Sequence, residues 1–529
     1  MAAIITSEFR KNSRQIFIND IKTSTVDDYF IGLGKTDSWP DTADAEGNQV
    51  TEYSRQFSAP VPTDTIINKT DVLKNLMVLV KTKAAEVFNV IPRNNWSFNR
   101  IYKLYDPTDP RCFDYETIDG VAHYPCYVTS NDRIYICLSN TDSNGEIVES
   151  TTAIPSGVGA TQTSSHSPAK LGNGEGYIWA YVTALDEDSK FYTDQFVNYT
   201  YPTGDLYTDI KSDTGGLVYG FKVINGGGAT ITTLNTTIKL VGTTRDGSGD
   251  IVPKADIVIK SDEEPETSFN VVFGANGIES ITYKEPVAAG TSPAWKTDFL
   301  SASVLVEVSG GATPTISETI EIVPYVLPYE GLGRYPDNDL PSFYAGIAVD
   351  FIGEVDGEAP VGYSVDLRQI SLVKNPTRNP LVTQANDNDD DAANPDGFYT
   401  HDEAYDALKY ITLPPTTLVK DYIGRDFIIE QKDTGARAWL DYADNINERL
   451  YYHQNSSPLV NFKKFSSESP GSIKITSIAG FWDGIEYQSN GVTNPEYLPE
   501  TGEVIFYENR KPINRNYNQT DEVKLVIQF

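Results

Sequence analysis

The sequence is poor in the residues that catalysis and metal binding most often use. Its 529 residues contain 4 histidines, 3 cysteines and 2 methionines. The histidines lie far apart and form neither an HExxH motif nor a Cys/His zinc spacing. We therefore expect no metal site and no cofactor, and we expect each histidine to be an ordinary loop or strand residue: His123, His166, His401 and His453.

Disulfide frameworks and membrane segments are also excluded by what is missing. Cys112, Cys126 and Cys137 are odd in number and form no CxxC pair, which favours a reducing compartment. The first residues, MAAIITSEFRKNSRQ, contain no apolar signal-peptide core, and no later run reaches transmembrane length. The sequence predicts a soluble protein that is neither inserted in a membrane nor exported by a signal peptide.

Positive charge is scarce. The chain has 42 Lys and Arg residues against 74 Asp and Glu residues, a formal net charge of −32. Binding to nucleic acid or to an anionic membrane needs a basic face, so neither is expected as the main partner. The acidity keeps a large, Tyr-rich protein soluble before it assembles. A host whose proteins are all acidic explains the same charge equally well.

Catalytic motifs are missing as well. The sequence has no GxSxG elbow and no GxxxxGK[ST] loop, and the glycines of GNGEGY (Gly172, Gly174, Gly176) precede a strand, as in a tight turn. The segment Asp387–Asp391 resembles the start of a calcium loop, but Ala392 and Phe398 stand where Gly and Glu are required. We therefore expect a solvated acidic loop, no enzymatic activity and no small-molecule ligand.

What the chain does have is strand- and turn-forming residues. It contains 6 Trp, 32 Tyr and 22 Phe together with 39 Gly and 30 Pro, and this composition favours strands and turns over helices. Ile16–Ile18 and Tyr29–Leu33 are predicted strands. Thr70 is predicted to cap one helix, in which apolar residues recur from Val72 to Val80. The predicted fold class is mostly β, a multi-domain β-sandwich-like body with few helices and inserted small β modules.

Changes in composition predict five segments. Glycine-rich turns separate β-branched runs between residues 214 and 310, which indicates an inserted all-β module. A second insertion with a small β module is predicted beyond the acidic loop. The predicted divisions are body at 1–213, Gly-rich module at 214–310, body at 311–378, second insertion at 379–490 and a C-terminal hairpin of the body at 491–529.

The last 29 residues alternate between apolar and polar side chains in two runs. Val504 to Glu508 forms one predicted strand, and Val523 to Phe529 forms the other. Period-2 burial places Val523, Leu525, Ile527 and Phe529 on one face, so Phe529 is predicted to be a core residue. Pro512 lies in the connection, outside either ladder.

Four sets of residues, in order along the chain, resemble one family. The resemblance is to the dimeric, mostly β wedge subunit of the tail baseplate in T-even-like contractile-tailed bacteriophages. The Gly-rich module and much of 379–490 have no counterpart in its shorter members. The residues that carry the resemblance are AIITSEFRKNSRQIFIND with FIGLGKTDSWP, APVPTDTIINKTDVLKNLMVLVK with NVIPRNNW, GNGEGYIWAY with RQISLVKNP, and GEVIFYENRKPI with QTDEVKLVIQF.

The resemblance implies a structural role. Subunits of this kind are homodimers in each wedge, bind other wedge proteins and help to transmit the rearrangement that triggers sheath contraction. The implied location is the tail baseplate of the virion, assembled in the host bacterial cytoplasm. On so acidic a chain we expect basic residues at the partner interfaces, and the candidates are Lys11, Arg14, Arg510, Lys511 and Arg515.

Two other functions stay open at this point. A receptor- or glycan-binding tail protein would use exposed aromatic clusters in residues 214–310 or 411–482. A carbohydrate-degrading enzyme would need two carboxylates about 5–9.5 Å apart in a cleft, a separation that sequence does not show.

Overall fold

The computed structural model describes most of the chain and divides it into two compact units. Unit 1 comprises Met1–Gln15, Phe88–Ala345 and Ile527–Phe529, and unit 2 comprises Ile16–Val87 and Gly346–Val526. The described residues are 6–39, 42–43, 49–50, 58–141, 146–150, 154–155, 169–170, 177–203, 210–211, 214–228, 230–232, 235–260, 269–283, 298–309, 315–316, 320–351, 365–380, 404–417, 427–445, 448–457, 459–460, 472–477, 485–488, 491–515 and 519–529.

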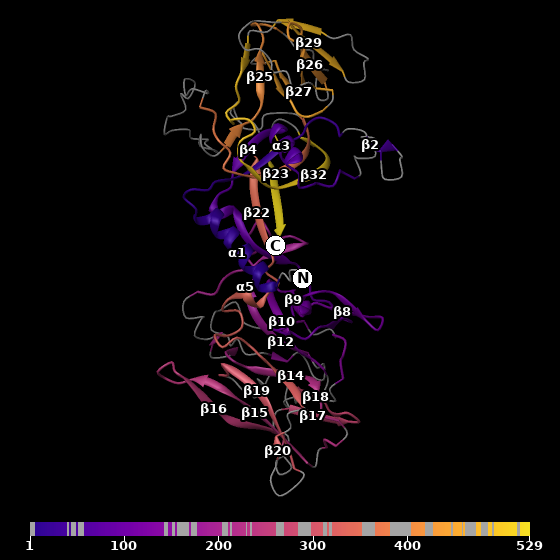
Figure 1. Cartoon of the computed structure of the whole chain (residues 1–529), viewed down its shortest axis with the longest axis vertical. Coiled ribbons are helices and arrows are strands. Elements are labelled where there is room, and N and C mark those ends of the chain that lie inside the picture. Colours follow the sequence, from indigo (N-terminus) through magenta and orange to yellow (C-terminus); the bar gives the residue numbers. More distant parts are fainter. Residues whose placement is uncertain are drawn as a thin grey trace. The chain divides into compact units, whose positions relative to one another are not determined.

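Unit 2 contains a five-stranded antiparallel sheet (Figure 1). All residues of the middle strand β1 and nearly all residues of its neighbour β4 are buried, because neighbouring strands and side chains cover both faces. The helix α3 (Ile66–Lys74) adds Val72 and Leu73 to the same core as Phe30 and Leu79. The strand order is β24 (Ala404–Asp406), β4 (Leu76–Lys81), β1 (Tyr29–Gly34), β23 (Val365–Lys374) and β32 (Glu503–Arg515).

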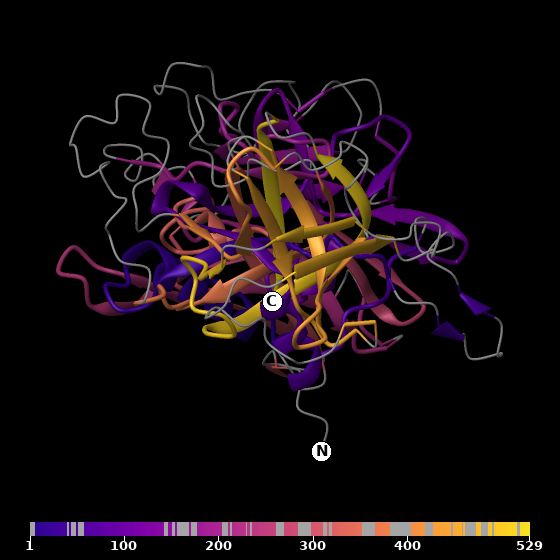
Figure 2. The same ribbon diagram turned by 90° about the horizontal axis from the view of Figure 1, so that it is seen from above.

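Unit 2 also contains a seven-stranded antiparallel sheet, which we call the 409–493 module. It has a core of its own, built from buried residues such as Ile429, Leu440 and Ile475. Figure 2 shows its orange and yellow strands from above. Their order is β30 (Ile485–Gln488), β29 (Ser472–Ser477), β26 (Phe427–Gln431), β27 (Ala436–Asp444), β28 (Arg449–His453), β25 (Lys409–Thr412) and β31 (Gly491–Thr493).

Unit 1 is a set of small sheets around one large apolar core. Tyr105 stacks on Tyr219 at 6.4 Å between ring centroids, so the segment after residue 214 shares this core with earlier residues. The paired strands are β11 (Ala169–Lys170), β12 (Tyr177–Ala184), β10 (Arg133–Asn140) and β9 (Tyr127–Ser130); β6 (Ile101–Tyr102), β8 (Val121–Tyr124) and β7 (Glu116–Ile118); β16 (Ile251–Lys260), β15 (Thr236–Arg245), β19 (Ser301–Val308) and β20 (Thr315–Ile316); β14 (Val218–Asn225) with β21 (Glu321–Val326); β17 (Phe269–Gly274) with β18 (Gly277–Tyr283); and β13 (Phe196–Asn198) with β5 (Val87–Pro92).

The remaining elements are short or pass from one unit to the other. Strands β22 (Tyr344–Phe351) and β33 (Asp521–Gln528) and the helix α1 (Ser7–Thr23) continue across the unit boundaries. The others are β2 (Thr42–Ala43) paired with β3 (Gln49–Val50), the helix α5 (Pro336–Asp339), and the 3-10 turns Ala84–Glu86 and Pro110–Phe113. The mostly β fold class with few helices is confirmed. The predicted boundaries of the modules at 214–310 and 379–490 stay a prediction.

Two local predictions were wrong. The residues Ile16–Ile18 lie in α1, not in a strand, and only Ile18 is buried. A run of three apolar residues is too short to distinguish the period of a helix from that of a strand. The apolar run after Thr70 is not one helix. Thr65 caps α3, which ends at Lys74, and Leu76 begins the strand β4. A continuous apolar run of this length suits a strand that is covered on both faces.

The prediction of a C-terminal hairpin was also wrong. Strand β32 pairs with β23 instead of β33, and β33 belongs to a different sheet. Strand β32 continues to Arg515 through a register shift opposite Arg368, and Pro512 lies in that bulge with no ladder partner. Val523 and Leu525 are buried as predicted, but Phe529 is only half-buried.

Candidate functional site

Two of the predicted interface residues, Lys11 and Arg14, lie on the first turns of α1. Lys11 is half-buried, and its ammonium donates to the Asn338 carbonyl at 2.6 Å. Burial lowers the pKa of Lys11 to about 8, and burial raises the pKa of nearby Asp339 to about 7. Arg14 has no exposed surface, and its guanidinium is 2.7 Å from an Asp337 carboxylate oxygen.

Arg14 is the centre of a polar network within unit 1, in which Arg14 and Tyr199 are buried. Its guanidinium also donates to the Asn89 side-chain oxygen at 2.7 Å. The hydroxyl of Tyr199 donates to one oxygen of Asp337, and the hydroxyl of Tyr201 donates to the other at 2.9 Å. These contacts bring together residues that no sequence motif connects. Arg14 therefore has an internal structural role in this conformation, and its role as a partner contact stays a prediction.

The other three predicted residues lie on β32. Arg515 is buried, and its guanidinium pairs with Asp521 and donates to the Gln519 carbonyl. Arg510 is half-buried and lies 3.1 Å from Glu508. Lys511 is exposed. Of the five, Lys511 is thus the one whose side chain is open to a partner without a change in the chain's own packing.

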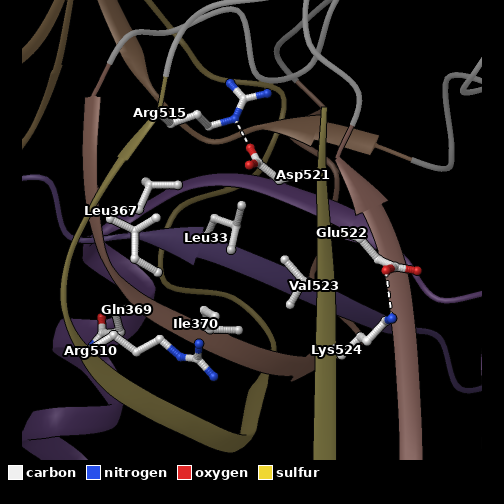
Figure 3. A pocket seen from close by; sticks show the side chains of 11 residues that line it. Leu33, Leu367, Gln369, Ile370, Arg510, Arg515, Asp521, Glu522, Val523 and Lys524 are labelled. Atoms are coloured by element: carbon white, nitrogen blue, oxygen red, sulfur yellow. Dashed lines mark hydrogen bonds and ion pairs between the residues drawn. The ribbon is translucent and has the colours of Figure 1, made fainter. Parts of the chain in front are cut away.

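A pocket of about 160 Å³ lies beside these residues (Figure 3). Leu33, Ile370 and Val523 line it with apolar surface, and the Arg515–Asp521 pair lies at one end. The charges around it are largely matched, since Glu522 also pairs with Lys524 at 2.8 Å. On a chain of net charge −32, this neutral rim is a place where a second protein meets little repulsion.

Among the described residues, no group of three or more His, Cys, Asp and Glu side chains is placed to hold a metal ion. In the same residues, no helix is both long and apolar enough to span a membrane. The acidic segment Asp387–Asp391 and the glycines of GNGEGY lie outside the described residues. His453 is not an ordinary strand residue, because it is buried between two carboxylates.

The three cysteines give a testable prediction. Cys112, Cys126 and Cys137 are all free and buried, and 3.4 Å separates the sulfurs of Cys112 and Cys126, longer than a disulfide bond. Burial raises the pKa of the Cys126 and Cys137 thiols, which keeps the reactive thiolate from forming. We expect none of the three to react with a thiol reagent at pH 8 in the folded protein, and all three to react in denaturant. Fast labelling of the folded chain would contradict this.

The comparisons with known proteins point to a class of viral structural protein, the wedge subunits of phage tail baseplates. Residues 3–215 match the family described as gp8 of bacteriophage T4. Over 200 residues the chain is 25% identical to the baseplate wedge protein gp8 of Enterobacteria phage T4. The aligned part is 35% of this chain and 56% of that protein, so the match spans about half of the curated relative.

The resemblance to the wedge subunit of T-even-like phages is confirmed by these matches. The matched residues include α1, with Lys11 and Arg14, and the sheet strands β1 and β4. Strands β23 and β32 and the 409–493 module lie outside them. The motifs RQISLVKNP and GEVIFYENRKPI therefore rest on the sequence pattern described above.

Proposed function

We propose that the chain is a structural subunit of the wedge in a contractile-tail baseplate and that it is not an enzyme. The observation that carries this proposal is the match of residues 3–215 to the gp8 family. In this proposal the protein resides in the tail baseplate of the virion and is assembled in the host cytoplasm. It forms a homodimer, binds other wedge proteins and helps to transmit the rearrangement that triggers contraction.

The fold is consistent with the proposed role of a structural subunit that transmits a rearrangement. Most of the described elements are antiparallel strands, and unit 1 packs stacked and edge-to-face aromatic pairs in its core, such as Tyr219 with Tyr325 at 5.7 Å. A densely packed core has low compressibility and transmits strain. The exposed Lys511 and the neutral pocket rim beside it support an assembly contact on β32.

Glycan binding has no comparable support. Among the described residues of 214–310 and 411–482, the largely exposed apolar side chains are aliphatic: Ile224, Ile251 and Leu459. Stacking on sugars requires exposed aromatic rings, so we do not propose this function for the described surface.

Assembly of the phage tests the proposal. A phage whose gene for this chain carries a nonsense codon should produce no assembled baseplate in cryo-electron micrographs, because a wedge without one subunit does not close. Expression of the intact chain from a plasmid should restore infectious particles. Normal baseplates without the chain would overturn the proposal.

The same complementation assay tests the contact on β32. Lys511→Glu should fold normally, because the side chain is exposed, yet restore far fewer infectious particles than the intact chain. Lys83→Glu, an equal charge reversal at another exposed position, serves as the matched control. Equal titres from both variants would remove Lys511 from the interface and leave the structural role standing.

A further inference from the structure

A buried cluster of charges joins the 409–493 module to the five-stranded sheet within unit 2. His453, at the end of β28, lies between Asp441 of β27 and Asp37, which follows β1. Its Nδ1 is 2.8 Å from both Asp441 oxygens, and its Nε2 is 3.2 Å from an Asp37 oxygen. The three residues are 5%, 1% and 3% exposed, so the cluster is almost fully buried.

Both ring nitrogens of His453 therefore face carboxylate oxygens. A neutral imidazole has one N–H and one lone pair, so one nitrogen would point its lone pair at a negative oxygen. Only the protonated ring donates on both sides. With both carboxylates ionised, this holds for either tautomer of the neutral ring.

The cluster is balanced only with that proton present. Lys35 lies 2.7 Å from Asp37 and supplies the second positive charge, so two cations oppose two carboxylates. Burial by itself lowers the pKa of His453, but Asp441 and Asp37 outweigh it and raise the pKa to about 10. Burial opposes ionisation of Asp37 too, and Lys35 and His453 outweigh it, so that the pKa of Asp37 lies below its usual value.

Other polar contacts at this junction are arranged around the cluster. The Asn455 side chain donates to Asp37 at 3.2 Å and to the Asn75 side chain at 2.9 Å, and it accepts from the Trp439 indole at 3.2 Å. The Thr36 hydroxyl donates to Asp441, and the Arg368 guanidinium donates to the Thr36 carbonyl and lies 3.7 Å from an Asp366 carboxylate oxygen. The Lys35 ammonium lies over the Trp39 ring. The Ser456 amide donates to the Asp71 carboxylate at 3.0 Å.

We propose that the proton on His453 locks the 409–493 module onto the gp8-like part of the chain, and that removing this proton loosens the junction while both sheets stay folded. The module has its own apolar core, so it does not need the junction in order to keep its sheet. Asp37, Lys35 and Asn75 lie within the matched residues 3–215, and His453, Asp441 and Asn455 lie outside them. The lock thus holds a part that the family match does not cover.

The direction with pH follows from the linkage between proton binding and stability. The pKa of His453 in the folded chain is above the ordinary value of about 6.5, so its contribution is complete below that pH. It falls as pH rises and is lost above about 10. One proton changes the opening equilibrium by at most about tenfold per pH unit.

Two measurements on the full chain test the proposal. With histidine labelled at Cε1, the chain has only 4 ring signals, and His453→Gln identifies one of them. That signal should keep the imidazolium shift at pH 8, where an ordinary histidine is neutral. Hydrogen exchange at Ser456, corrected for its intrinsic pH dependence, should accelerate by several-fold to tenfold per unit between pH 8 and 10.

Amides in the module core, such as those of β27, serve as the internal reference and should keep their protection over the same range. His123→Gln, the same substitution in unit 1, should leave Ser456 exchange unchanged. The proposal is overturned if the His453 signal titrates near pH 6.5, or if Ser456 and the module core lose protection in parallel. The wild-type titration decides this even if His453→Gln does not fold.

Discussion

Replacing Arg14 with methionine is expected to destabilise unit 1 by about 3 kcal/mol, because removing one partner of a buried ion pair leaves the other uncompensated. Arg14 has no exposed surface, and Asp337 would lose its 2.7 Å ion pair while remaining 77% buried at the side chain, given its 23% exposure. Methionine conserves much of the arginine's apolar stem, so the loss reports mainly the charge.

Hydrogen exchange of unit 1 amides, or the first thermal transition, measures this effect without assuming that the whole chain unfolds in one step. Asp337→Asn should also destabilise, since it leaves a buried guanidinium without its counter-ion. The double variant should destabilise unit 1 by less than the sum of the two single variants, because each change removes the other's unpaired partner.

Arg111→Met is the control. Arg111 makes a 2.7 Å pair with Asp109 but is largely exposed, so no measurable change is expected. Equal effects at Arg14 and Arg111 would contradict the role assigned to burial.

The same contacts explain what sequence reasoning reached and what it missed. A short apolar run next to polar residues was predicted close to its observed position, as for β1, which the sequence placed at Tyr29–Leu33 and the structure places at Tyr29–Gly34. Local pattern carries that information, because a short, continuous apolar run with polar residues at its ends is typical of a strand that is covered on both faces. Ile16–Ile18 was too short a segment to distinguish a helix from a strand, and long-range packing decided it.

The polar clusters depend on chain topology instead. Arg14 and Asp337 are 323 residues apart, and Asp37 and His453 are 416 residues apart. No spacing or motif links residues at such distances, so Arg14 was predicted as a surface contact and His453 as an ordinary residue. The one hint in the sequence is the scarcity of histidine, and it carries no positional information. The pairing of β32 with β23 was missed for the same reason, since a hairpin is the nearest partner along the chain but not in this fold.

Gly34→Ala is the second change with a large expected effect. Gly34 lies at a register shift between β1 and β4, where the two backbones approach closely. An added Cβ would lie 2.1 Å from the Asn75 carbonyl oxygen and 3.1 Å from the Leu76 Cα. That carbonyl already accepts from the Lys35 amide at 3.0 Å, and Asn75 ends α3, so the backbone has little freedom to move away.

We therefore expect Gly34→Ala to cost about 3 kcal/mol or more, the upper part of the range for overpacking. Exchange of the β4 amides measures the loss, and the 409–493 module should loosen with it, because Asn75 and Lys35 both belong to the junction. Gly247→Ala is the matched control, since a Cβ there meets nothing within 4 Å, and its cost should stay within about 0.5 kcal/mol. If Gly34→Ala proves as mild as Gly247→Ala, the close approach of β1 to Asn75 is wrong. The junction that depends on it would then lose its support, because Lys35 and Asp37 lie within three residues of Gly34 and are positioned by the same backbone.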